Sequence, residues 1–192
     1  LGHIVENNVL VEALWQALQP LNNVSLHCPD KIRAVSDQED SVMLTLQSGL
    51  EISAGIAIGA DGARSKVRDL IGIETSVHDY AQKGLVAFVK TELPHRHTAW
   101  QRFLSTGPLA FLPFGEHVCS IVWTLPDDRA EALLQADAEA CCRALDSAFA
   151  GTLGKTELVS ERAAFPLKRQ LAKTMMQERT LLLGDAAHAV HP

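Results

Sequence analysis

The carboxyl-terminal residues combine glycine, aspartate and histidine directly after an apolar run. The run 181–183 predicts a short buried strand, and Gly184 and Asp185 follow it at once. Glycine lets a ligand approach the backbone, and the aspartate presents a carboxylate at the carboxyl end of the strand. Because ligands of open α/β sheets bind at that edge, Asp185 is a candidate acceptor for the vicinal hydroxyls of a ribose or ribityl chain. An ordinary polar turn that ends a strand is the alternative.

A second apolar strand runs into an acidic turn far upstream. Residues 56–58 are followed by Gly, Ala, Asp61 and Gly62, and then by a stretch in which Val67 begins an apolar helical face and Ser65 can cap the helix. Three basic side chains lie near the start of this helix, where backbone N–H groups are free to bind an anion. They are Arg64, Lys66 and Arg68. The segment suits a pyrophosphate, and ordinary turn chemistry with solvated charges is the alternative.

The remaining pattern predicts the elements that position these turns. Apolar residues at helical spacing predict a helix over 8–19, and the stretch 127–150 predicts two more helices that end at Gly151. Short strands, separated by polar turns, are predicted over 24–28, 32–35, 42–46, 51–52 and 56–58. Longer strand-like runs, joined by short turns as in an antiparallel sheet, are predicted over 85–90, 99–104, 109–112, 118–125 and 157–165.

Composition excludes several classes of protein. The chain has 192 residues and a net charge of −6, and its 17 basic residues are scattered, which argues against a nucleic-acid partner. The four cysteines lack CxxC spacing and are predicted to be reduced thiols, buried or half-buried, in a cytoplasmic protein. No apolar run reaches the length of a membrane span.

Metal and nucleophile chemistry find less support. His188 and His191 lie close to Asp185 in the sequence, but a metal site needs three or four ligands with supporting contacts, so we predict no metal. No Ser/His/Asp or Cys/His arrangement can be assembled by spacing.

Taken together, the two acidic turns resemble the GADG and GDAAH motifs of the flavin-dependent aromatic hydroxylases, the family typified by para-hydroxybenzoate hydroxylase. Residues 2–15, 109–113 and 119–123 further resemble the VisC/UbiI branch of ubiquinone biosynthesis, the 2-octaprenylphenol hydroxylases. The chain nevertheless has no GxGxxG, and it stops at Pro192, where that family continues into a Gly-rich turn. It therefore resembles an internal piece of a longer protein, which we expect to bind FAD poorly and to be inactive alone.

The resemblance implies an α/β (α+β) fold. A partial FAD/NAD(P)-binding, Rossmann-like domain would comprise residues 1–75 and 171–192, and an inserted antiparallel-sheet substrate domain would comprise residues 76–170. The resemblance also implies which residues contact the cofactor, with the Asp185 carboxylate on the ribityl chain of FAD. They are Asp61, Gly62, Arg68, Gly184, Asp185, Ala186, His188 and Pro192.

The activity implied by the resemblance is ring hydroxylation of a prenylated phenol or quinol in ubiquinone biosynthesis. NAD(P)H would reduce FAD, O₂ would add to the reduced flavin, and the C4a-hydroperoxide would hydroxylate the ring. Because the substrate is lipophilic, we expect contact with the inner face of a membrane or with a membrane-associated complex. No side chain is assigned as a general base. A related flavoprotein reductase or halogenase, or a non-catalytic assembly subunit, is the alternative.

Apolar side chains of the antiparallel segment have two possible roles. They either line a pocket for a lipophilic aromatic substrate or form ordinary sheet core. They are Phe103, Leu109, Phe111, Leu112, Phe114 and Trp123.

Overall fold

The structure is a computed structural model that describes residues 2–190, so Pro192 and His191 lie outside the described residues. These residues form two compact units. Residues 7–78 and 168–190 form one, which we call the turn unit, and residues 2–6 and 79–167 form the other, which we call the sheet unit. The predicted domain boundaries stay a prediction.

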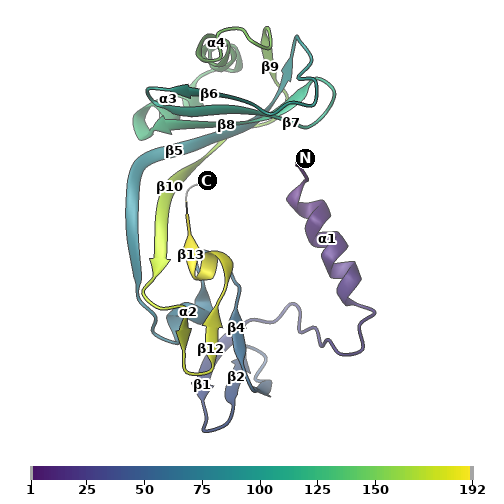
Figure 1. The fold of residues 1–192 in the computed structure, drawn as a ribbon, viewed down its shortest axis with the longest axis vertical. Coiled ribbons are helices and arrows are strands. Elements are labelled where there is room, and N and C mark those ends of the chain that lie inside the picture. Colours follow the sequence, from purple (N-terminus) through teal and green to yellow (C-terminus); the bar gives the residue numbers. More distant parts are fainter. Residues whose placement is uncertain (1, 191–192) are drawn as a thin grey trace. The chain divides into compact units, whose positions relative to one another are not determined.

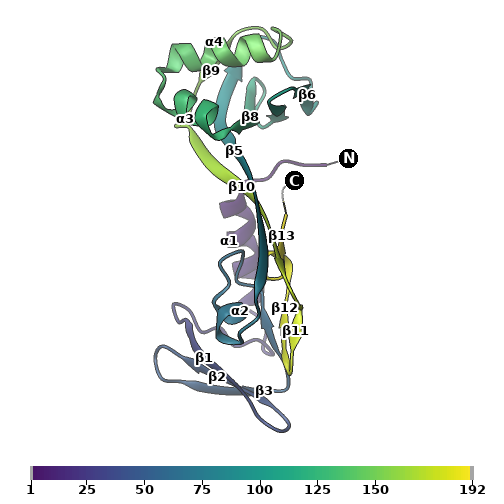
Figure 2. The same cartoon turned by 90° about the vertical axis from the view of Figure 1, so that its left-hand side faces the viewer.

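The turn unit begins with a helix and a β-meander, largely as expected. Helix α1 spans Asn7–Leu18. Strands β1 (Ile32–Asp37), β2 (Val42–Leu46) and β3 (Glu51–Ala54) pair antiparallel in that order (Figure 2). The strand predicted over 24–28 is wrong. Leu26 is exposed rather than packed, and Pro29, which follows, has no N–H for a ladder.

The two acidic turns follow a pair of parallel strands. Strand β4 (Ala57–Gly59) lies beside β12 (Thr180–Leu182), and β11 (Met176–Gln177) pairs with β12 on its other side. Helix α2 (Lys66–Leu70) follows the first turn, and a 3₁₀ turn (Gly184–Ala186) forms the second. The expected burial holds for one face only: Leu182 is 4% exposed and Leu183 is 61% exposed.

Two long strands each contain residues of both units. Strand β5 spans Thr75–Thr91 and strand β10 spans Ala163–Ala172. Within the turn unit, β10 pairs antiparallel with β13 (His188–Ala189).

The sheet unit is an antiparallel sheet with helices on one face. Its strands run in the order β5, β8 (Val118–Pro126), β7 (Gly107–Pro113), β6 (Trp100–Leu104), and β9 (Thr156–Leu158) pairs with the end of β5. Helices α3 (Asp127–Gln135) and α4 (Ala138–Ala148) lie together over this sheet (Figure 1). Two helices were expected here.

The single strand predicted over 157–165 is wrong, because it is broken between β9 and β10. The Phe88 N–H donates to Ser160 Oγ at 2.8 Å instead of to a backbone carbonyl. Arg162 turns toward α3, where its guanidinium donates to the carbonyls of Leu133 and Ala136 at 2.6 and 2.7 Å. These side-chain contacts replace ladder hydrogen bonds and stop the strand.

Side chains alternate between the two faces of the sheet along each strand, and this separates the apolar residues into a buried set and an exposed set. Leu109, Phe111 and Trp123 are buried in the core beneath the helices. Phe103 and Leu112 alternate with residues of that core and therefore lie on the opposite face, where Phe103 is 80% exposed. The helix-covered face is thus ordinary core, and the other face is open.

The cysteines are free thiols. Cys119 and Cys141 are fully buried, and burial raises the pKa of Cys119 to about 11, so its thiol is unreactive. Cys28 is exposed, whereas it was expected to be buried or half-buried. Within residues 2–190, the helices are all too short or too polar to cross a bilayer.

The close packing of α2 on β4 predicts a mutational cost. A Cβ at Gly59 would lie 2.9 Å from Val67 Cβ and 3.1 Å from Leu182 Cδ2. We expect Gly59→Ala to destabilise the full-length protein by about 1–3 kcal/mol in urea unfolding, because the helix must move away from the strand. Gly55→Ala is the matched control, since a Cβ there meets nothing within 4 Å. Equal stability of the two variants would contradict this packing.

Candidate functional site

Parallel pairing of β4 with β12 brings the two acidic turns to one edge of the small sheet. Ile58 pairs with Leu181 and Gly59 with Leu182. The Leu183 N–H then donates to the Gly59 carbonyl at 2.9 Å. Since the carboxyl ends of parallel strands meet at the same edge, the turns that carry Asp61 and Asp185 leave the sheet side by side.

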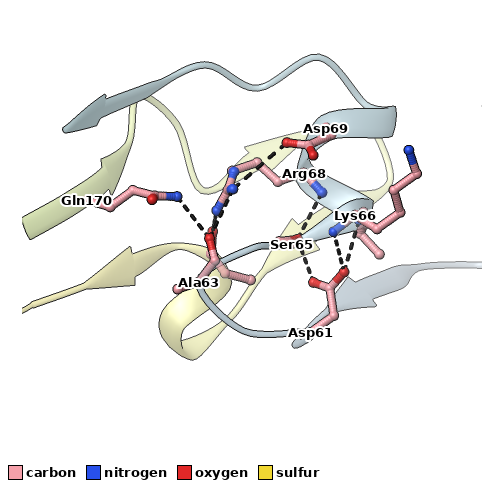
Figure 3. A network of polar contacts seen from close by, with 9 residues as sticks. Asp61, Ala63, Ser65, Lys66, Arg68, Asp69 and Gln170 are labelled. Atoms are coloured by element: carbon pink, nitrogen blue, oxygen red, sulfur yellow. Dashed lines mark hydrogen bonds and ion pairs between the residues drawn. The ribbon is translucent and has the colours of Figure 1, made fainter. Parts of the chain in front are cut away.

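The Asp61 carboxylate caps helix α2 (Figure 3). Its Oδ2 accepts from the backbone N–H groups of Lys66 at 2.7 Å and Val67 at 3.0 Å, and its Oδ1 accepts from Ser65 Oγ. Ser65 Oγ in turn accepts from the Arg68 N–H at 3.0 Å, so the cap assigned to Ser65 from the sequence is confirmed. The first N–H groups of α2 therefore have partners within the chain.

These contacts set the charge state of Asp61. Partial burial acts to raise the pKa of its carboxyl, but the hydrogen bonds from Ser65, Val67 and Lys66 outweigh burial and hold the pKa below its usual 3.8. The carboxylate is consequently charged at neutral pH.

Arg68 joins the two turns (Figure 3). Its guanidinium donates to the Ala186 carbonyl at 3.0 Å from one nitrogen and to the Ala63 carbonyl at 3.1 Å from the other. The side chain is only 7% exposed, and an ion pair to Asp69 at 3.8 Å accompanies these bonds. Gln170 Nε2 donates to the same Ala63 carbonyl at 3.0 Å. Arg68 thus points inward and holds the backbones of both turns.

The second turn combines a buried backbone with exposed polar side chains. Ala186 is fully buried against Val67 and Leu182, whereas Asp185 and His188 are exposed. Within residues 2–190, the Asp185 carboxylate has neither a hydrogen-bond nor an ion-pair partner.

Two glycines make the turns accessible. Gly62 and Gly184 have φ of +83° and +59°, a region that side chains rarely adopt, and a Cβ at either would meet nothing within 4 Å. Backbone that is open to approach, next to an unpaired carboxylate, fits the extended, hydroxyl-rich chain of a dinucleotide.

The structure therefore separates the predicted site residues into two groups. Asp61, Arg68 and Ala186 make contacts within the protein that hold the turns in place. Gly62, Gly184, Asp185 and His188 make no such side-chain contacts, and an incoming ligand can reach them, as it can the exposed edge of Asp61. Among the cations near α2, Arg64 and Lys66 remain exposed, and the pyrophosphate hypothesis now rests on them. Contact with a cofactor stays a prediction for every residue of the site.

Sequence reasoning missed Gln170, because nothing in the pattern of β10 distinguishes it from other polar strand residues. It was also placed in the other predicted domain. No group of three potential metal-ligating side chains occurs within residues 2–190, and the histidine at 191, which the metal alternative needs, is not among them.

Removal of the Arg68 bridge should cost substantial stability. We expect Arg68→Met to lower the free energy of unfolding of the full-length protein by about 2–4 kcal/mol, because two charge-assisted hydrogen bonds disappear and the Ala186 carbonyl loses its side-chain donor, while Ala63 keeps only the bond from Gln170. Arg68→Lys should rescue little, since a single ammonium nitrogen replaces the two separate guanidinium nitrogens that reach the two carbonyls. The control is Arg64→Met, which removes an exposed cation. If Arg68→Met and Arg64→Met melt together, the bridge contributes nothing.

The Asp61 cap should give a pH-dependent contribution to stability. A carboxyl whose folded-state pKa is lowered stabilises the fold above its unfolded-state pKa of about 3.9 and loses that contribution as pH falls through the folded value. The difference in unfolding free energy between wild type and Asp61→Ala should therefore be about 1–2 kcal/mol at neutral pH and should shrink below about pH 4. Asp128→Ala serves as the control. A difference that persists unchanged at pH 3 would rule out a charged cap.

Comparison with known proteins identifies the chain's family. The model of the FAD binding domain family matches residues 8–192. The chain is 37% identical to the 3-demethoxyubiquinol 3-hydroxylase of Escherichia coli and 36% identical to the ubiquinone hydroxylase UbiL of Rhodospirillum rubrum, over all of its own length. It spans 49% and 45% of these relatives, about half of each.

A solved structure agrees with this fold. The chain resembles pqsL from Pseudomonas aeruginosa with a TM-score of 0.79 and 23% identity, over 95% of this chain and 53% of that one. The resemblance to flavin-dependent aromatic hydroxylases and the α/β fold class are confirmed. The chain belongs to the FAD binding domain family, within the superfamily of flavin monooxygenases typified by para-hydroxybenzoate hydroxylase.

Proposed function

We propose that the full-length protein containing this chain is an FAD-dependent monooxygenase of ubiquinone biosynthesis. It hydroxylates the ring of a prenylated phenol or quinol with O₂, and NAD(P)H is its reductant. The observation that carries the proposal is the convergence of two turns on one edge, with Arg68 bonded inside and Asp185 left unpaired outside. The names of its relatives, both ubiquinol or ubiquinone hydroxylases, supply the substrate class.

The cofactor side of the proposal assigns a role to each accessible residue. The Asp185 carboxylate accepts hydrogen bonds from ribityl hydroxyls, and Gly62 and Gly184 let the dinucleotide approach the backbone. Arg64 and Lys66 offset phosphate charge. When bound, FAD supplies the redox chemistry that activates O₂. The side chains of this chain bind and orient it.

Bare apolar surface beside the turns supports a larger cofactor domain in the full-length protein. Strand β4 ends the order β11, β12, β4, and Ile56 and Ile58 are 59% and 63% exposed. Parallel strands are normally covered on both faces and contain few exposed apolar residues. We infer that a segment of the longer protein covers this face, which agrees with the half-length match to the relatives.

The open face of the sheet unit is the proposed substrate surface. A hollow of about 350 Å³ lies there, and it is lined by Val86, Ala87, Phe88, Ser120, Ser160, Glu161 and Ala163. Its size lies near the lower end of the range for small-molecule sites, roughly 300–1,000 Å³, and it suits an aromatic ring with its prenyl tail along the apolar strands. Because such a tail partitions into a bilayer, we further propose that the protein works at the membrane surface or in a membrane-associated complex.

The test uses the full-length protein. We expect it to purify with a flavin absorption spectrum and, with NAD(P)H and a prenylated phenol, to transfer one atom of ¹⁸O₂ to the ring. Asp185→Ala should weaken FAD affinity about 10–100-fold, the loss of one or two charge-assisted hydrogen bonds. Glu51→Ala, which removes an exposed carboxylate from β3, is the control. A colourless protein, a product without label, or equal FAD affinity of the two variants would overturn the proposal.

A further inference from the structure

The hollow on the open face of the sheet unit contains a single ionisable side chain. Among the described residues that line it, only Glu161 carries a charge, and no cation accompanies it. Glu161 is exposed, and within residues 2–190 its carboxylate has neither a hydrogen-bond nor an ion-pair partner. A carboxylate only accepts hydrogen bonds. The hollow therefore offers a free acceptor to a ligand that carries a donor.

The direction of the Glu161 side chain follows from that of its neighbour. The Arg162 guanidinium donates to the carbonyls of Leu133 and Ala136, on the helix-covered side of the sheet. Adjacent side chains of an extended segment point to opposite sides, and Glu161 accordingly lines the hollow on the open side. The nearest cation along the chain is thus bonded elsewhere and does not neutralise the Glu161 carboxylate.

Ser160 fixes this segment against strand β5. Its Oγ accepts from the Phe88 N–H at 2.8 Å and donates to the Glu161 carbonyl at 2.8 Å. The hydroxyl of Ser160 is therefore used within the protein rather than left for a ligand. Because both bonds involve backbone atoms, they hold the main chain at Glu161 beside Phe88.

An aromatic ring forms one wall of the hollow. Phe88 is half-buried, and its ring centroid lies 4.8 Å from that of Phe114 at an interplanar angle of 53°. Ser120 pairs with Phe88 across β5 and β8, and its side chain lies on the open face because its neighbours on β8 are in the core. Rings favour tilted and offset arrangements, so a ligand ring can pack on Phe88 beside two polar side chains, Ser120 and Glu161.

Charge selects among ligands that contain such a ring. A neutral phenol donates its O–H to a carboxylate, and charge-assisted hydrogen bonds of this kind are stronger than those between neutral groups. The corresponding methyl ether has no donor. Glu161 repels a ring that carries a carboxylate of its own, and no lining cation compensates for that repulsion. The hollow therefore favours a neutral, hydroxylated ring.

We propose that Glu161 determines the ligand specificity of this hollow: its carboxylate accepts a hydrogen bond from the ring hydroxyl of a neutral phenol and disfavours a carboxylated ring. The inference rests on the proposed function, which makes the open face the substrate surface, and it adds the side chain that positions the ring. Binding requires neither NAD(P)H nor turnover, so this inference and the proposed function can fail separately.

The test measures equilibrium binding by calorimetry in the full-length protein without NAD(P)H. The probes are 4-butylphenol, its methyl ether 4-butylanisole, and 4-butylbenzoate, which share one alkyl chain. We expect the wild type to bind the phenol at least about tenfold more tightly than the ether, the effect of one hydrogen bond to a charged group. The benzoate should bind less tightly than the phenol.

Two variants separate hydrogen bonding from charge. Glu161→Ala should reduce the preference for the phenol over the ether to less than about threefold. Glu161→Gln keeps an acceptor without the charge, so it should retain part of that preference and raise the affinity for the benzoate about two- to fivefold. Glu157→Ala, which removes an exposed carboxylate from β9 outside the hollow, is the matched control and should leave all three affinities unchanged.

Equal affinities for the phenol and the ether in the wild type, an undiminished preference in Glu161→Ala, an equal loss in Glu157→Ala, or no binding of any probe would overturn the inference. The transfer of ¹⁸O tests the proposed function separately. A protein that hydroxylates a prenylated phenol but binds the probes without dependence on Glu161 refutes only the role of this residue. A protein that binds the probes as described without hydroxylation refutes only the proposed function.

Discussion

The candidate site depends on a single buried guanidinium. Arg68 lies 118 residues before Ala186, yet one of its nitrogens donates to the carbonyl of that residue while another donates to Ala63. A guanidinium is suited to this task because it is planar, always charged, and donates in several fixed directions at once. The parallel strands β4 and β12 bring the turns to one edge, and Arg68 then fixes the distance between their backbones. Without that bond, the two turns would still lie at one edge of the sheet, but the distance between their backbones would not be fixed.

Some charged side chains near the turns bond within the protein, and others point to solvent. Asp61 uses its carboxylate to cap α2, and Arg68 is buried, so both act on the protein itself. Asp185 is exposed and unpaired within the described residues, which leaves its oxygens for hydroxyl donors. The sheet unit shows a similar division between its two faces: helices cover one, and the other carries half-buried apolar side chains. In both units, some side chains pack or bond within the protein, and neighbouring ones remain exposed.

The local sequence pattern predicted most of the helices and strands. The features that it missed depend on which distant segments a strand or side chain contacts. Strand β2 was predicted at its observed bounds, and the caps and turns of the two motifs followed from glycine, aspartate and serine chemistry. The expected strand over 24–28 does not form, because alternation cannot reveal whether a neighbouring strand exists to pair with it. The sequence could not reveal either that the Arg68 side chain points into the protein. On a helix of five residues, whether a cation faces solvent or the interior depends here on a carbonyl contributed by a segment more than a hundred residues away.

We propose that the two acidic turns form one surface for a single dinucleotide. A crystal structure of the full-length protein with bound FAD would test this. We expect the Asp185 carboxylate to lie within hydrogen-bond distance, about 2.5–3.0 Å, of a ribityl hydroxyl. We also expect cofactor atoms in van der Waals contact with the backbone at Gly62 and Gly184, while Arg68 keeps its bonds to Ala63 and Ala186. FAD bound away from this edge, or a cofactor that displaces Arg68 from those carbonyls, would contradict the proposal.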